Sequence, residues 1–168
     1  MKAKTVRWSA ITLAFGMVAC MPEPAAVEQP FSFNHTIHVE RQGIPCTDCH
    51  PGAESEVHAG LPSLSRCLIC HMKPQGDKPS VREQEVRKMA ASGFKLFWKQ
   101  VTRNPGHVYV SHRAHVGVAK LPCEGCHGNV ADWLTPPTMP IADLIDMDSC
   151  LACHRKSGAS PNCRSCHK

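Results

Sequence analysis

Ten of the 11 cysteines in this 168-residue chain stand in pairs separated by two residues, and a histidine directly follows each pair. The five copies read CTDCH (46–50), CLICH (67–71), CEGCH (123–127), CLACH (150–154) and CRSCH (163–167). At positions i, i+3 and i+4 of a helical turn, three side chains share one face. Two thiols can then bond a porphyrin edge while the histidine binds the iron. The motif therefore predicts five covalently bound haem c groups.

Each motif supplies two predicted thioether cysteines and one predicted iron ligand. The cysteines are Cys46, Cys49, Cys67, Cys70, Cys123, Cys126, Cys150, Cys153, Cys163 and Cys166, and the histidines are His50, His71, His127, His154 and His167. Zinc binding and disulfides are the alternatives for paired cysteines. Neither would require an adjacent histidine at all five pairs, so haem is the preferred interpretation.

An internal repeat organises four of the remaining six histidines. Residues 33–52, FNHTIHVERQGIPCTDCHPG, align without a gap with residues 110–129, VSHRAHVGVAKLPCEGCHGN. The alignment pairs His35 with His112 and His38 with His115. It predicts a module at 31–79 with two motifs and a module at 105–168 with three. The recurrence of the histidine pairs ahead of a CxxCH motif marks them as candidate ligands on the second side of the irons.

Residues 1–20 have the pattern of an export signal, because three basic residues precede an apolar stretch at about 8–18. This stretch is too short for a comfortable bilayer crossing. It ends in MVAC, which resembles a bacterial lipoprotein cleavage site and predicts an acylated Cys20 that holds the protein at the membrane surface. An ordinary signal peptide or short anchor is the alternative. Without the signal, the excess of basic residues is small, so the charge gives no argument for nucleic-acid binding.

The rest of the chain offers connecting segments and little core. Residues 21–30 are typical of an extended tether, and 129–149 of an irregular loop that wraps a haem. A helical linker is predicted at 80–104, with Ser80 and Glu83 as a capping box and Gly93 as a potential break. Its Phe94, Phe97 and Trp98 are interpreted as packing on haem edges rather than as a docking face. Because only 5% of the residues are aromatic, five porphyrins are expected to supply the missing core.

These motifs resemble the class III cytochromes c, in particular the c7 and c3 types. The resemblance implies a haem-organised multihaem cytochrome, mostly irregular with short α-helices, built as two c7-like modules joined by a helical linker. It also implies that the first histidine of each pair serves the first haem of its module and the second serves a neighbouring haem. The implied iron-ligand pairs are His35 with His50, His38 with His71, His112 with His127, and His115 with His154.

The second ligand of the fifth haem is less clearly marked. In c7 domains it is a histidine shortly before the second CxxCH motif of the domain, but residues 128–149 contain none. They do contain Met139 and Met147, and a thioether ligand raises the haem potential relative to two histidines. Met147 is therefore the first candidate, and His107 and His58 are the alternatives.

The order of features from residue 29 to 155 is similar to the pentahaem subunit of alternative complex III. The similar segments are QPFSFNHTIHV, AGLPSLSRCLICH (59–71), HVYVSHRAHV, CEGCHGNV and MDSCLACHR (147–155). This resemblance implies electron transfer from a molybdopterin and iron-sulfur type subunit, which is fed by a quinol-oxidising membrane subunit, to a cytochrome c or an oxidase. It implies a location in the bacterial periplasm, at the outer face of the inner membrane.

Two other functions remain as alternatives. One is a free periplasmic or extracellular electron carrier of the c7/c3 type. The other is a multihaem redox enzyme, which needs an iron with an open face. All five motifs end in histidine and enough spare ligands exist to close every iron, so an electron-transfer protein is favoured over an enzyme, and only the fifth haem could be a catalytic site.

Overall fold

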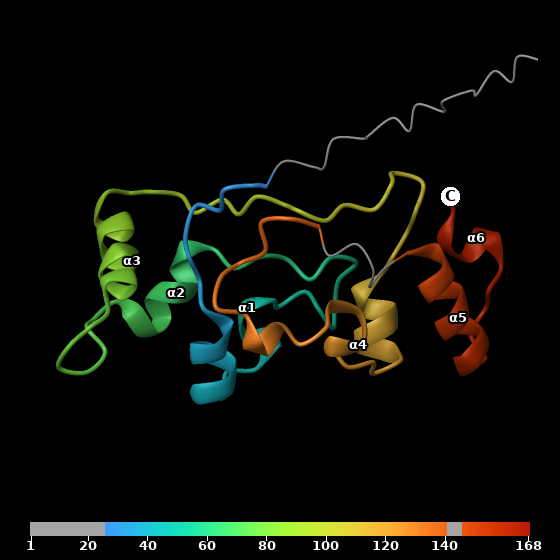
Figure 1. Ribbon diagram of the computed structural model, residues 1–168, viewed down its shortest axis with the longest axis horizontal. Helices are drawn as coiled ribbons and strands as arrows, with labels where there is room; N and C mark the ends of the chain where they lie inside the picture. Colours follow the sequence, from blue (N-terminus) through green and yellow to red (C-terminus); the bar gives the residue numbers. More distant parts are fainter. Residues whose placement is uncertain (1–25, 141–145) are drawn as a thin grey trace, which may run out of the picture.

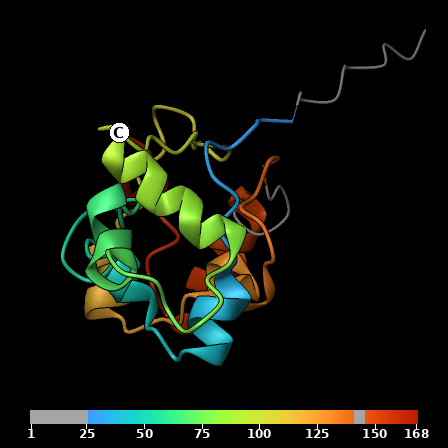
Figure 2. The same ribbon diagram turned by 90° about the vertical axis from the view of Figure 1, so that its left-hand side faces the viewer.

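The computed structural model describes residues 26–140 and 146–168. The predicted export signal, Cys20 and the first half of the tether lie outside the described residues. The described chain is extended along one axis, with the helices following one another along it (Figure 1). Viewed from its left-hand end, the same helices superpose in a compact cross-section (Figure 2).

Short helices joined by irregular segments make up the described chain. The elements are η1 (Thr36–Arg41), α1 (Cys46–Cys49), α2 (Leu64–His71), α3 (Val81–Ala91), η2 (Arg113–Val118), α4 (Glu124–His127), η3 (Val130–Asp132), α5 (Met147–Ser157) and α6 (Cys163–Cys166). No β-strand occurs among the described residues, which contain only an isolated antiparallel bridge between Val108 and His167. The predicted fold class, mostly irregular with short α-helices, is confirmed.

The two copies of the sequence repeat have the same local structure. Residues 36–41 and 113–118 occupy equivalent repeat positions, and both form π-helical turns, η1 and η2. In each turn, the Nδ1–H of the second histidine donates to the carbonyl oxygen four residues earlier, at 2.8 Å. The limits of the two modules themselves remain a prediction.

Backbone contacts join the segment after α1 to η2. The His112 N–H donates to the Val57 carbonyl at 3.0 Å, and the Arg113 N–H donates to the Glu56 carbonyl at 2.8 Å. Gly117 lies against the same segment so closely that a Cβ there would clash with the Glu54 carbonyl oxygen. Only glycine fits at this crossing, which holds the two repeat copies side by side.

A small apolar core lies at the α2 and α3 end. Leu64, Val86 and Leu96 are buried together, and the half-buried Trp98 packs against them. The Trp98 indole N–H donates to the Pro62 carbonyl at 2.8 Å. The other buried apolar side chains among the described residues, Ala53 and Pro136, lie outside this cluster. The rest of the described chain therefore has no protein core of its own.

Helix α3 is shorter than the sequence pattern predicts. It begins as expected, because the Ser80 hydroxyl accepts the Glu83 N–H at 3.1 Å. It ends at Ala91, where the Gly93 N–H donates to Ala90 and the Phe94 N–H donates to Met89. Gly93 has φ of +69°, so it forms the left-handed end of a Schellman motif. The predicted helix over 94–104 is wrong, and these residues form an irregular, extended segment instead.

Candidate haem-binding sites

Each CxxCH motif lies on or at a short helix, as bonding of two thiols and one imidazole to a single haem requires. Helices α1, α2, α4, α5 and α6 carry the five motifs in chain order. Two of these helices begin with side-chain caps: the Asp146 carboxylate accepts the Ser149 N–H at 2.6 Å, and the Asn162 side chain accepts the Arg164 N–H at 3.2 Å. The caps fix the helical turn from which the thiols project.

Four of the motif histidines face a second imidazole from elsewhere in the chain. The centroid distances are 6.0 Å for His38 and His71, 6.2 Å for His112 and His127, 6.1 Å for His115 and His154, and 5.4 Å for His107 and His167. The rings of His112 and His127 are almost parallel, with an interplanar angle of 7°. Every pair joins residues that are distant in the sequence.

These distances fit a metal ion between two imidazoles. A bond from a metal to an imidazole nitrogen is about 2 Å long, so ligands on opposite sides of one ion have ring centroids roughly 6 Å apart. Three of the four pairs, at 6.0 to 6.2 Å, lie at this value, and the pair of His107 and His167 is shorter, at 5.4 Å. The residues therefore fit a haem iron held from both sides.

In five histidines, the hydrogen bond made by one ring nitrogen shows that the other ring nitrogen is free to bind iron. Their Nδ1 atoms lie within hydrogen-bond distance of backbone carbonyl oxygens, which can only accept. The pairs are His38 with Asn34 and His115 with Ser111 at 2.8 Å, His50 with Gly60 and His154 with Ser160 at 2.7 Å, and His112 with Val57 at 3.1 Å. Each Nδ1 must then carry the hydrogen, which leaves the Nε2 lone pair free for a metal.

His35 lies in the environment expected for the remaining ligand pair, with His50. Burial, followed by the nearby imidazoles of His50 and His38, lowers the pKa of His35 to about 4. The imidazole is therefore neutral at neutral pH, as an iron ligand must be. Its edge also contacts the Trp133 ring, at 5.9 Å between centroids, and its backbone N–H donates to the Trp133 carbonyl at 2.8 Å.

Thiols of different motifs lie next to one another in a regular order. Burial raises the pKa of the Cys67 thiol, and the neighbouring Cys49 thiol raises it further. Burial likewise raises the pKa of Cys123, and so does the Cys46 thiol, which is hydrogen-bonded to it. Burial and then Cys153 raise the pKa of Cys126, and burial and then Cys166 raise that of Cys150. These neighbours link the motifs in the order α2, α1, α4, α5, α6.

The order of the helices in space is the same. Along the long axis of the molecule, α3 and α2 lie at one end, followed by α1, α4, α5 and α6 (Figure 1). An ion pair of 3.6 Å between Arg66 and Asp48 joins α2 to α1. Burial, followed by the imidazoles of His112 and His50, lowers the pKa of His127, so the first and third motifs also meet through their histidines.

The structure brings His107, rather than Met147, to the fifth motif. The rings of His107 and His167 are stacked at an interplanar angle of 23°. Hydrogen bonds hold this segment against α6, since the Tyr109 N–H donates to the Cys166 carbonyl at 2.7 Å and the Lys168 N–H donates to the His107 carbonyl at 3.2 Å. Met147 is the first residue of α5 and is 63% exposed. Sequence spacing could not rank His107 first, because the contact joins residues far apart in the chain.

The other histidine and methionine considered as second ligands of the fifth haem lie away from the contact between His107 and His167. His58 is exposed in the segment after α1, and Met139 is 39% exposed in the irregular segment after η3. The ring that lies against His167 in the described chain is that of His107. Both stay sequence-based candidates without structural support.

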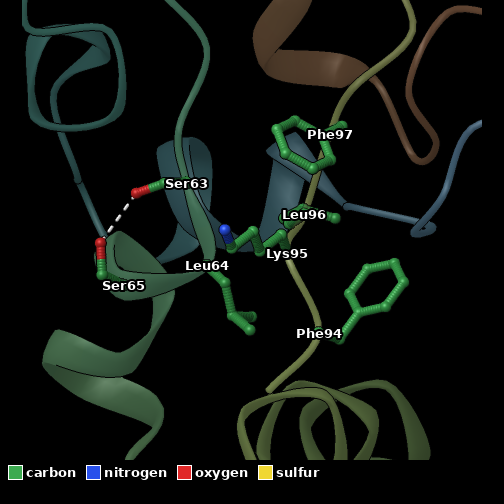
Figure 3. Close-up of a pocket in the computed structure, with 7 residues that line it drawn as sticks. All are labelled: Ser63, Leu64, Ser65, Phe94, Lys95, Leu96 and Phe97. Carbon is green, nitrogen blue, oxygen red and sulfur yellow. Dashed lines mark hydrogen bonds between the residues drawn. The ribbon is translucent and has the colours of Figure 1, made fainter. Parts of the chain in front are cut away.

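An apolar groove of about 310 Å³ lies beside the small core (Figure 3). Ser63, Leu64 and Ser65, at the start of α2, line one side, and residues 94–97 line the other. Phe97 is 73% exposed there. The groove contains no thiol or imidazole, so it belongs to the surface of the protein and not to the predicted iron sites.

Comparison with known proteins identifies the class of protein. The family model described as cytochrome c7 and related cytochrome c matches residues 108–168. Together with the facing imidazoles, this match defines a multihaem c-type cytochrome, an electron-transfer protein that carries covalently bound haem c.

A curated relative extends the likeness to almost the whole chain. The chain is 31% identical to the menaquinone reductase, multiheme cytochrome c subunit, of Nitratidesulfovibrio vulgaris (strain Hildenborough), over 94% of this chain and 86% of the relative. The chain belongs to the family of this multihaem cytochrome subunit. The resemblance to c7-type cytochromes is thus confirmed, whereas membership of alternative complex III remains a prediction. Among the described residues, no helix has the length and apolar character needed to cross a bilayer.

Proposed function

We propose that this chain is the pentahaem electron-transfer subunit of a membrane-attached complex that exchanges electrons with quinones. The observation that carries the proposal is the single row of CxxCH helices, each with its motif imidazole beside a second imidazole. When bound, each haem supplies one-electron chemistry between Fe(II) and Fe(III). The name of the relative, a menaquinone reductase subunit, supports the link to quinones.

The chain's own residues would act as a scaffold that sets distance and order. The histidine pairs of η1 and η2 each reach two motifs: His35 and His38 lie beside the motifs of α1 and α2, and His112 and His115 beside those of α4 and α5. One short segment thereby fixes two neighbouring haems relative to each other. The resulting order is α2, α1, α4, α5, α6, with the ends at His71 and His167.

The proposed partners follow the family resemblance. They are a molybdopterin and iron-sulfur type subunit, a quinone-reactive membrane subunit, and a downstream cytochrome c or oxidase. We place the protein in the periplasm, at the outer face of the inner membrane, with Cys20 as its lipid anchor. A relay of this kind is reversible, so the scaffold serves electron flow from quinol as well as flow toward quinone.

Purification of the native protein from membranes tests this function. We expect the tagged chain to require detergent for extraction, to bring iron-sulfur and membrane subunits with it, and to be reduced when the complex receives a quinol. Its mass should exceed that of the polypeptide by five haem groups. A soluble chain purified alone would indicate a free carrier instead. As a control for the anchor, exported protein with Cys20→Ser should leave the membrane fraction unless partners hold it there.

Substitution of His107 tests the second ligand of the fifth haem. We expect His107→Ala to convert one haem of five from low spin to high spin and to let that reduced haem bind carbon monoxide, because one side of the iron is then open. Electron paramagnetic resonance and carbon monoxide difference spectra measure both changes. Met147→Leu is the matched control and should leave five low-spin haems. The opposite result, with a 695 nm band lost in Met147→Leu, would restore Met147 as the ligand.

A further inference from the structure

His71 differs from the five histidines whose Nδ1 atoms bond backbone carbonyls. Its Nδ1 is buried without a hydrogen-bond partner. The nearest acceptor is a carboxylate oxygen, Glu83 Oε1, at 3.8 Å. At this distance the contact is an electrostatic one rather than a hydrogen bond. The motif imidazole that would hold the haem of α2, at one end of the row, therefore faces a negative charge.

Glu83 is held in this position by a dedicated set of contacts. Its side chain is 8% exposed, and its Oε1 accepts the Gln75 backbone N–H at 2.8 Å and the Arg87 guanidinium at 2.6 Å. Val86, which is buried in the small core, fixes the same face of α3. In the predicted capping box, the Glu83 carboxylate would turn back to the N–H of Ser80. It turns instead toward His71.

The carboxylate remains charged in this site. The Gln75 N–H and the Arg87 guanidinium both donate to its Oε1, and the positive charge of Arg87 at 2.6 Å stabilises the anionic form. A buried acid without such partners would become neutral instead. A fixed negative charge beside an iron-binding imidazole makes the ligand a stronger electron donor and stabilises the ferric state.

We propose that Glu83 is a positioning residue that lowers the reduction potential of the haem bound through His71. The proposal rests on the function proposed above, since it requires a haem on Cys67 and Cys70. Arg87 opposes the effect, because its positive charge partly neutralises the carboxylate. The pair therefore sets the potential at the α2 end of the row, independently of the iron ligands themselves.

The test is a redox titration of the full pentahaem protein, followed by proton NMR of the haem methyl groups so that each haem is observed separately. We expect Glu83→Gln to favour reduction of the haem on His71 by about tenfold, which is 59 mV for a one-electron couple. The other four haems should shift much less. Glutamine keeps the size of the side chain and its acceptor for the Gln75 N–H.

Two further variants separate charge from structural damage. Glu85→Gln removes a carboxylate from the same helix, where Glu85 pairs with Arg82 at the surface at 2.9 Å, and it should leave all five potentials unchanged. Arg87→Gln should shift the potential of the haem on His71 in the opposite direction to Glu83→Gln. If the haem on His71 is present and neither variant at 83 or 87 moves its potential, or both move it alike, the role of Glu83 is refuted. If the wild-type protein has no haem on Cys67 and Cys70, the proposed function fails as well.

Discussion

The chain produced without haem attachment is expected to be unfolded. The buried apolar side chains among the described residues are Ala53, Leu64, Val86, Leu96 and Pro136, and three of them belong to one cluster. This core lies at one end of an elongated molecule, and the helices that carry the motifs bury no residue at α1, α4, α5 or α6. Without porphyrins, too little apolar surface is buried to order a chain of this length.

Expression in cells that lack the haem-attachment machinery would measure this effect. The holoprotein should unfold in a cooperative thermal transition, whereas the haem-free chain should show none and should exchange its amide hydrogens rapidly. The expected loss is the whole free energy of unfolding, about 5–15 kcal/mol for a native domain. In the haem-free chain, protection of amide hydrogens from exchange is expected only around α2, α3 and Trp98. A haem-free chain with a cooperative transition and native helix content would contradict the role of haem as the core.

Removal of the third haem is expected to divide the relay into two parts. The motif of α4 lies between the motifs of α1 and α5, since Cys123 neighbours Cys46 and Cys126 neighbours Cys153. Substitution of both Cys123 and Cys126 by alanine should therefore abolish fast electron exchange between the haems of α1 and α2 and those of α5 and α6. Within each part, the contacts that hold neighbouring motifs together remain.

Partially reduced protein observed by NMR provides the measurement. When electrons exchange rapidly between the haems of one molecule, each haem gives one signal averaged over its oxidised and reduced forms. Slow electron exchange gives separate signals for the two forms. When the third haem is missing, we expect electron exchange between the two parts of the relay to be slow and therefore to give separate signals. The matched control is the alanine variant of Cys163 and Cys166, which removes a haem from the end of the row and should leave the other four in fast exchange. If removal of the terminal haem divides the signals and removal of the third does not, the order α2, α1, α4, α5, α6 is wrong.

Much of the cofactor chemistry could be predicted from local sequence. A CxxCH motif places three side chains on one helical turn, so the nature of its cofactor depends on neighbouring residues and needs no long-range contact. The HxxH segments are equally local, and their recurrence ahead of a motif predicted a repeated structure, which the matching turns η1 and η2 now show. The low aromatic content likewise predicted a chain with little core.

Other features depend on contacts that no local pattern describes. His107 meets His167 only because the segment before η2 runs along α6. In the same way, η2 packs on the segment after α1, where Gly117 allows a close crossing. Helix α3 ends at Ala91 because Gly93 completes a Schellman motif, although the apolar spacing continues. Glu83 turns from its capping role because Arg87, Gln75 and His71 surround its carboxylate. The sequence by itself thus determined which groups are candidates for haem binding, since the spacing of a CxxCH motif acts within a single turn. Only the tertiary structure decided which groups become neighbours, because that depends on how distant segments pack.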